Sequence, residues 1–289
     1  MERRHTGGAT AIRPLAGGTT VNRLTCFTVA TPLACVMLTC TPAHAFDEEL
    51  QTIPTRPGVT QAFLLVKPAS RPVASVSLFA GGDGRLALSD RGIGSGRNNF
   101  LVRTRALFAD RGFLVALVDA PSDHARDGIR SFRTSEAHAQ DIAGVIASVK
   151  QHVDAPVCLI GTSAGTLSAA NAAARIRQGM GGLVLASAIT RRATRAPDSL
   201  MDVDLQNITV PTLLVHHKYD TCLVTPYADI PAVMQRLIHA PKVELVTFEG
   251  GDMPRSDPCQ NLSYHGFLGI EPAVVAAIAR WVKTTAGVE

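Results

Sequence analysis

Short apolar segments alternate with longer helical patterns from Gln61 onward, and this alternation constrains the possible folds more than any other feature of the sequence. The candidate strands, rich in β-branched residues, span 62–66, 73–79, 113–118, 157–161, 183–187, 212–216 and 243–248. The candidate helices span 100–111, 135–153, 164–178, 230–238 and 271–285. Strands joined by helical crossovers are typical of a parallel sheet that is covered on both faces. We therefore predict an α/β fold with a mostly parallel central sheet and helices on both of its faces.

The predicted sheet also indicates where a functional site belongs. Right-handed crossovers place the carboxyl ends of parallel strands at one edge, and open α/β sheets bind ligands beyond that edge. Residues 190–208 are too few for a cap domain, so we expect no large cap and an open edge. Residues 46–60, with three acids and two prolines, fit either an irregular lead-in or an edge strand. We expect 46–289 to form one domain, because no repeat or linker interrupts this stretch.

The segment from Gly161 to Gly165, with the sequence G-T-S-A-G, carries the clearest chemical signal. It follows the candidate strand 157–161 and opens an alanine-rich helix, which is the context of the G-x-S-x-G nucleophile elbow. Such a serine has a strained backbone, and its neighbours must be small so that strand and helix can approach each other. We interpret Ser163 as a nucleophile; the alternative is an ordinary serine in a turn bounded by glycines.

A serine hydroxyl needs a base, and the base needs an acid that orients it. Asp220 begins the loop after the candidate strand 212–216, and His265 lies in the loop after the strand 243–248. The order serine, aspartate, histidine along the chain is that of the α/β-hydrolases. The chain resembles this family over roughly residues 61–288, and the elbow and the segment PTLLVHHKYD (211–220) are the most specific parts of the resemblance.

The resemblance implies that Ser163 is the nucleophile, His265 the general base and later the acid, and Asp220 the residue that orients the histidine. It implies no cofactor and no metal. Three other residues could take part of these roles: His124 as the base, and Asp204 or Asp252 as the acid.

The resemblance also implies an oxyanion hole. One donor is the backbone N–H of Ala164, and the other comes from the loop after the strand 73–79, where Gly82 is the first candidate and Asp83 the second. Relatives carry a histidine in an HGGG-like run at this point, and Ala80 stands in its place. Residues 82–87 also fit a relaxed dinucleotide-binding pattern, although no helix is expected to open there.

Two further patterns allow more than one interpretation. His216 and His217, with Asp220, could suggest a metal site, but adjacent residues of a strand point to opposite faces. Cys222 and Cys259 lie in the two loops that carry the predicted acid and base, so we predict a disulfide between them in an oxidising compartment. The alternative is two unpaired thiols.

The first 45 residues resemble a secretory signal peptide. Arginines precede an apolar run at 25–38, and Ala43-His44-Ala45 follows it. The run is shorter than the roughly 20 residues of a membrane-spanning helix; the alternative is an uncleaved anchor or a lipoprotein. Removing 1–45 takes away four arginines and one glutamate, so the net charge falls from +4 to +1. We therefore expect a periplasmic or secreted protein that neither binds nucleic acid nor stays inserted in a membrane.

The substrate is the least constrained part of the prediction. The loop 81–99 contains Arg85, Arg91 and Arg97, which fits either binding of an anionic group or an ordinary solvated loop. No long apolar lid helix is evident, which favours small or water-soluble esters over triglycerides. The predicted function is a serine hydrolase that cleaves small-molecule carboxylic esters through an acyl-enzyme. The alternatives are a peptidase or amidase with the same triad and a non-catalytic binding protein with this fold.

Overall fold

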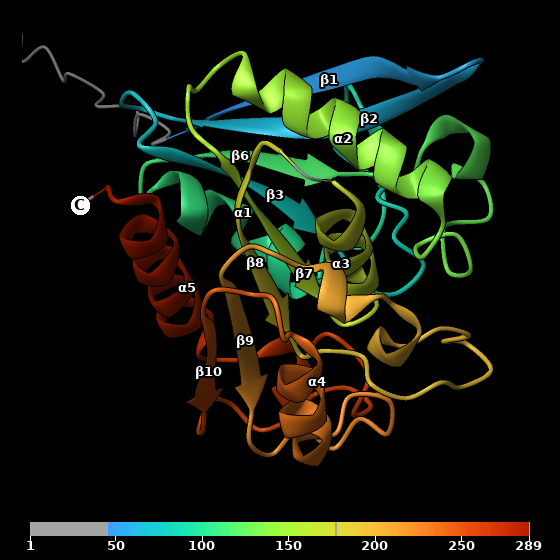
Figure 1. Cartoon of the computed structure of the whole chain (residues 1–289), viewed down its shortest axis with the longest axis vertical. Helices are drawn as coiled ribbons and strands as arrows, with labels where there is room; N and C mark the ends of the chain where they lie inside the picture. The colour runs from blue at the N-terminus through green and yellow to red at the C-terminus, as the bar shows by residue number, and fades with distance from the viewer. Residues whose placement is uncertain (1–45, 177, 289) are drawn as a thin grey trace, which may run out of the picture. The chain divides into compact units, whose positions relative to one another are not determined.

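A computed structural model describes residues 46–176 and 178–288. Its centre is an eight-stranded sheet in the order β1-β2-β6-β3-β7-β8-β9-β10 (Figure 1). The strands are β1 (Phe46–Arg56), β2 (Val59–Pro68), β3 (Ala74–Phe79), β6 (Phe113–Val118), β7 (Val157–Thr162), β8 (Met180–Ala186), β9 (Thr212–His217) and β10 (Val243–Phe248). Strand β2 is antiparallel to both of its neighbours, and the other pairs are parallel. The predicted mostly parallel sheet is confirmed.

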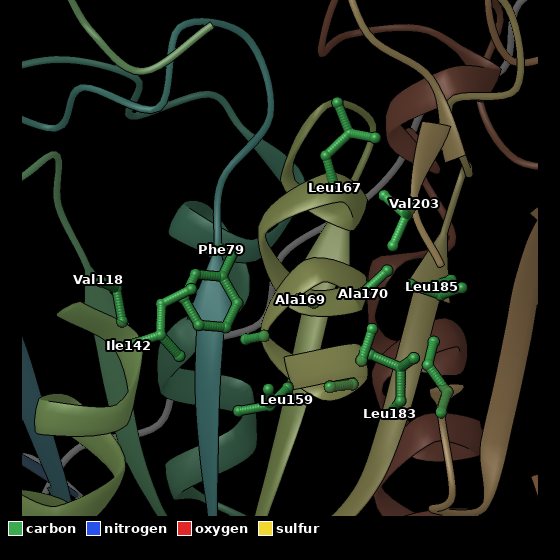
Figure 2. Packing of buried hydrophobic residues seen from close by; sticks show 14 of the residues in the cluster. Phe79, Val118, Ile142, Leu159, Leu167, Ala169, Ala170, Leu183, Leu185 and Val203 are labelled. Carbon is green, nitrogen blue, oxygen red and sulfur yellow. The ribbon is translucent and has the colours of Figure 1, made fainter. Parts of the chain in front are cut away.

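Helices cover both faces of this sheet, as predicted. The helices are α1 (Phe100–Ala109), α2 (Glu136–Lys150), α3 (Gly165–Arg175), α4 (Ile230–Arg236) and α5 (Glu271–Ala286). Helices α2, α3 and α4 contribute to the apolar core on one face, and α1 and α5 to the core on the other. In the first core, Ala169 and Ala170 of α3 lie over Leu159 of β7 and Leu183 of β8 (Figure 2). Their small side chains allow α3 to lie close to the strand that it follows.

The bounds of some strands differ from the sequence-based expectation. Residues 46–60, for which two interpretations were open, contain the edge strand β1, and Arg56 at its end forms an ion pair with Asp141 of α2 at 2.9 Å. Strand β8 begins at Met180 rather than 183, because Gly181 and Gly182 belong to it. A Cβ on Gly182 would lie 3.1 Å from Trp281, so glycine lets α5 pack on this strand.

Among the described residues, no cap domain covers the carboxyl edge of the sheet. The chain between β8 and β9 makes only two short 3₁₀ turns, Leu200–Asp202 and Leu205–Asn207, and the loop after β3 contains a small hairpin of β4 (Leu88–Ser89) and β5 (Gly92–Ile93). Within the described residues, no helix combines the length and the apolar character that crossing a membrane requires. The segment 1–45, predicted as a signal peptide, lies outside the described residues.

Candidate active site

Ser163 occupies the sharp turn between β7 and α3. Its φ of 54° is in the left-handed region, which is uncommon for a residue with a side chain. The two glycines of the motif are required by contact: a Cβ on Gly161 would lie 2.4 Å from the oxygen of Gly165, and one on Gly165 would lie 2.0 Å from the oxygen of Phe79. The structure thus places Ser163 at the tip of a tightly packed elbow, as the sequence predicts.

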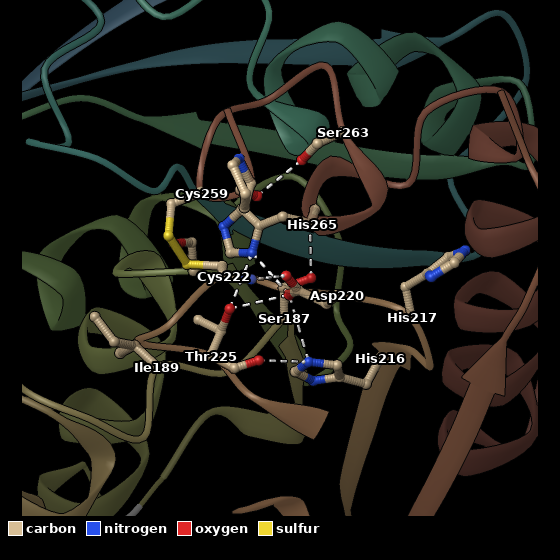
Figure 3. A network of polar contacts seen from close by, with 12 residues as sticks. Ser187, Ile189, His216, His217, Asp220, Cys222, Thr225, Cys259, Ser263 and His265 are labelled. Atoms are coloured by element: carbon tan, nitrogen blue, oxygen red, sulfur yellow. Dashed lines mark hydrogen bonds and ion pairs between the residues drawn. A yellow bond between two sulfur atoms is a disulfide. The ribbon is translucent and has the colours of Figure 1, made fainter. Parts of the chain in front are cut away.

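Asp220 and His265 meet beyond the ends of β9 and β10. The Nδ1 of His265 lies 2.9 Å from Oδ2 of Asp220, and both residues are buried (Figure 3). The second carboxylate oxygen accepts the backbone N–H of Cys222 at 2.9 Å. Thr225 donates its hydroxyl to Oδ2 at 2.9 Å, and its Oγ1 lies 3.1 Å from Nδ1 of His265. The carboxylate is therefore fixed by several donors and can orient the imidazole.

These contacts also keep Asp220 ionised. Burial by itself raises the pKa of the carboxyl group, but hydrogen bonds from His216 and His265 and from the N–H of Cys222 hold it well below its usual range. An ionised Asp220 requires a proton on Nδ1 of His265, which leaves Nε2 of this imidazole as an acceptor. That is the tautomer a general base needs.

Ser163 and His265 line one cavity of about 420 Å³, which Ala164 and Gly82 also line. Asp220 bonds the imidazole of His265 and does not itself line the cavity. No hydrogen bond joins the Ser163 hydroxyl to His265 among residues 46–288. Hydrogen bonds between catalytic groups are often long before a substrate binds. The structure therefore brings Ser163 and His265 to one cavity without a hydrogen bond between their side chains.

The loop after β3 packs directly against the elbow. A Cβ on Gly81 would lie 2.9 Å from Cβ of Ser163, so only glycine permits this approach. Gly82 has a φ of 67° and is exposed in the cavity wall. Within the described part of the chain, neither the N–H of Gly82 nor that of Ala164 donates a hydrogen bond. Both donors predicted for an oxyanion hole are therefore free for a ligand.

Arg133 anchors this loop, a role that the sequence-based prediction did not include. The side chain is only 1% exposed, and its guanidinium donates to the oxygens of Ala80 at 2.9 Å and Gly82 at 3.4 Å. It also donates to Oγ of Ser168 in α3 at 2.7 Å. The guanidinium thus ties the loop that carries Gly82 to α3.

Cys222 and Cys259 are joined by a disulfide with an S–S distance of 2.06 Å, as predicted. The bond connects the loop of Asp220 to the loop that leads to His265. Cys158 is a free buried thiol whose pKa is raised by burial. Ser187 adds a second tie, because its hydroxyl donates to the backbone oxygen of His265 at 2.8 Å.

The adjacent histidines at the end of β9 have different environments, as their alternation in a strand predicts. Nε2 of His216 donates to the oxygen of Thr225 at 2.9 Å and lies 3.5 Å from Asp220 (Figure 3). His217 bonds the oxygen of Gly250 at 2.9 Å and stacks on Tyr264. Within the described residues, no group of three or more His, Cys, Asp or Glu side chains is arranged to hold a metal ion.

The other candidate bases and acids lie away from the cavity. His124 bonds its neighbour Asp123 at 3.0 Å and stacks on Phe132. Asp252 forms an ion pair with Arg255. Neither His124, Asp252 nor Asp204 lines the cavity of Ser163.

Thr225 and Arg133 are the site residues that the sequence-based prediction missed. Thr225 follows Asp220 by only a few residues, but no pattern distinguishes it from other loop threonines. Arg133 lies in the loop before α2, far along the chain from the elements it contacts. A buried arginine whose partners lie this far along the chain is recognised only in three dimensions.

The fold is similar to solved structures of hydrolases at low sequence identity. An esterase of Pyrococcus furiosus superposes with a TM-score of 0.61 at 14% identity, over 84% of this chain and 93% of that chain. An esterase from an Arctic intertidal metagenomic library gives 0.60 at 13%, over 84% and 95%. Proline iminopeptidase of Mycobacterium smegmatis gives 0.59 at 13%, over 82% and 99%. The sequence matches no family model and no curated protein. The strand order, the elbow and these similarities together establish that the chain has the α/β-hydrolase fold.

Proposed function

We propose that this protein is a serine hydrolase that cleaves carboxylic esters through an acyl-enzyme intermediate. The observation that carries the proposal is the buried hydrogen bond between Asp220 and His265 at 2.9 Å, beside a cavity that the strained Ser163 also lines. A binding protein needs neither a strained serine nor an oriented imidazole. The solved esterases with this fold also support the proposal.

The proposed reaction has two halves. Oγ of Ser163 attacks the ester carbonyl while Nε2 of His265 takes the hydroxyl proton, and the N–H groups of Ala164 and Gly82 bind the oxyanion. The carbon–oxygen bond to the alcohol then breaks, and His265 gives its proton to the leaving alkoxide. In the second half, His265 takes a proton from water, which attacks the acyl carbonyl and releases the acid and free Ser163. Asp220 stabilises the imidazolium that forms in each half.

Labelling with a fluorophosphonate tests the activated serine directly. We expect the purified protein to be labelled, and Ser163→Ala to be unlabelled because the attacking oxygen is absent. His265→Ala should label at least about 100-fold more slowly because the general base is lost. Ser70→Ala, which removes an exposed serine that does not line the cavity, is the matched control and should still be labelled. A folded wild-type protein that stays unlabelled would sink the enzyme proposal and favour a binding role.

A peptidase or amidase is the second candidate, because proline iminopeptidase and an acylaminoacyl peptidase share the fold. The same purified protein should be given an ester and an amide with identical acyl groups. We expect hydrolysis of the ester only. Efficient cleavage of the amide would replace the esterase proposal with the peptidase one.

We also propose that the protein works in the periplasm or outside the cell. The disulfide between Cys222 and Cys259 supports this compartment, because such bonds persist in oxidising surroundings. The leader-like segment 1–45 supports it independently. Amino-terminal sequencing of the exported protein should begin at Phe46; a chain found reduced and full-length in the cytosol would contradict the proposal.

A further inference from the structure

Three arginines line the cavity that contains Ser163 and His265. Arg85 lies in the loop after β3, Arg130 in the loop between β6 and α2, and Arg195 in the loop after β8. In the sheet, β6 and β3 lie on one side of β7, and β8 lies on the other. The fold therefore brings three guanidinium groups from both sides of the elbow to one cavity.

None of these three arginines forms an ion pair among the described residues. Two other arginines in the loop of Arg195 do form ion pairs. Arg191 is paired with Asp229 at 2.8 Å, and Arg192 is paired with Asp202. Arg195, only a few residues farther along, has no such partner. In the loop after β8, the two arginines outside the cavity are thus paired with carboxylates, and the arginine that lines the cavity is not.

The cavity wall contains little negative charge to balance them. Among its lining residues Asp83 is the only acid, and its carboxylate accepts the backbone N–H of Arg85 at 3.1 Å. The buried Arg133 adds a further positive charge behind the oxyanion loop. This excess of positive charge gives the cavity a positive potential that attracts an anion.

Backbone carbonyls, rather than carboxylates, hold two of the guanidinium groups in position. Arg85 donates to the oxygen of Arg126 at 3.2 Å, and Arg130 donates to the oxygen of Arg195 at 3.0 Å. A carbonyl fixes a guanidinium without cancelling its charge, and each arginine has five N–H donors. Nε of Arg85 is buried and has no acceptor among the described residues. These arginines are therefore oriented and still able to donate to a ligand.

We propose that the substrate carries a carboxylate group that binds to Arg85, Arg130 and Arg195 while its ester carbonyl lies at Ser163. This inference rests on the proposed esterase function and specifies its substrate class, the half-esters of dicarboxylic acids. The planar fork of a guanidinium matches both oxygens of a carboxylate. Apolar side chains, among them Ile189, line the same cavity and suit a short hydrocarbon chain between the two groups.

Paired substrates that differ only in charge test this inference. The 4-nitrophenyl half-ester of glutarate has a free carboxylate, and its methyl ester is the neutral counterpart. We expect wild-type kcat/KM to be at least about tenfold higher for the charged substrate. Gln in place of Arg85, Arg130 or Arg195 should lower this preference about three- to tenfold each, with the neutral ester changed less than about twofold.

Arg126→Gln is the matched control. Arg126 is an exposed arginine in the same loop as Arg130 and does not line the cavity. Because its backbone oxygen stays in place, the variant removes one positive charge and keeps the contact to Arg85. Loss of the preference in this control to the same extent would show a diffuse charge effect and overturn the assignment. Arg85 is partly buried, so Arg85→Lys is made as well and should keep part of the preference.

A binding measurement separates failure of this inference from failure of the esterase proposal. Glutarate is titrated into the Ser163→Ala protein in a calorimeter, with and without the triple Arg→Gln change. We expect binding only with the arginines present. If glutarate binds but a fluorophosphonate does not label the wild-type protein, the anion site would be retained and the esterase proposal rejected. Equal binding with and without the arginines, or a charge preference that survives their loss, would overturn the inference.

Discussion

At the scale of one residue, Arg133 shows how a single buried side chain holds a loop of the candidate site. Burial, the largest cause, lowers the pKa of its guanidinium to about 9, so the group is charged at neutral pH. It has no ion-pair partner among the described residues, and its hydrogen bonds go to Ala80, Gly82 and Ser168. Burying a charge without a counterion is costly. The cost is consistent with a functional demand: the loop of the proposed oxyanion hole must not move.

Replacing Arg133 with Ala should therefore affect catalysis more than binding. We expect kcat for ester hydrolysis to fall about 100-fold, comparable to the loss of one oxyanion donor, with KM changed less than about threefold. Added guanidinium ion should restore part of kcat in the variant, because it can occupy the emptied position. Ammonium ion at the same concentration serves as the comparison, and wild type with guanidinium as the control. If the variant lost thermal stability along with kcat and guanidinium ion did not restore kcat, the role of Arg133 would be purely structural.

At the scale of the elements, the strands and helices could be predicted because local patterns encode them. Runs of β-branched residues and helical periodicity are properties of short segments, and the elbow glycines reflect contacts between adjacent elements. The start of β8 was less predictable, because glycine is uncommon in strands and both Gly181 and Gly182 lie in this one. The anchoring of the oxyanion loop by Arg133 and the support of Asp220 by Thr225 could not be predicted. They depend on where separate loops meet.

The disulfide between Cys222 and Cys259 connects two such loops, and its removal tests how far it supports them. The bond closes a segment with a sequence separation of 37. Loss of this closure in the double Cys→Ala variant should lower the free energy of unfolding by about 3–4 kcal/mol. Urea unfolding of both proteins measures it, and dithiothreitol should shift only the wild-type curve. Identical midpoints for wild type and variant would show that the two loops are held by their other contacts.

At the scale of the whole molecule, a buried network connects α2 to the sheet edge and makes stability depend on pH. Nε2 of His138 lies 2.9 Å from Oγ of Ser168, and this hydroxyl oxygen accepts a hydrogen bond from Arg133. Burial, followed by the charges of Arg133, His124 and Arg56, lowers the pKa of His138 to about 3 from its ordinary 6.5. Between these two values the unfolded chain binds a proton that the folded protein excludes.

The contribution of the neutral His138 to the free energy of unfolding should consequently be fully present above pH 6.5. It should be lost progressively as the pH drops toward 3. The contribution of His138 is about 1.4 kcal/mol of unfolding free energy per pH unit in that range. Urea titrations from pH 4.5 to 6.5 avoid most of the carboxylate titration, and His138→Gln should give a shallower slope. His152→Gln, at an exposed histidine, is the control and should keep the wild-type slope. Parallel slopes for wild type and His138→Gln would refute the assignment.

The position of His265 beyond the last strand has a consequence for how the protein is made. A chain is synthesised from its amino end, so β7 and the elbow of Ser163 emerge well before β10 and the loop that follows it. Cys259, which ties that loop to the acid, emerges late as well. Under the proposed mechanism, an unfinished chain contains a serine without a base. The order of the residues thus delays reactivity until the molecule is nearly complete, which protects the producing cell from a partly made hydrolase.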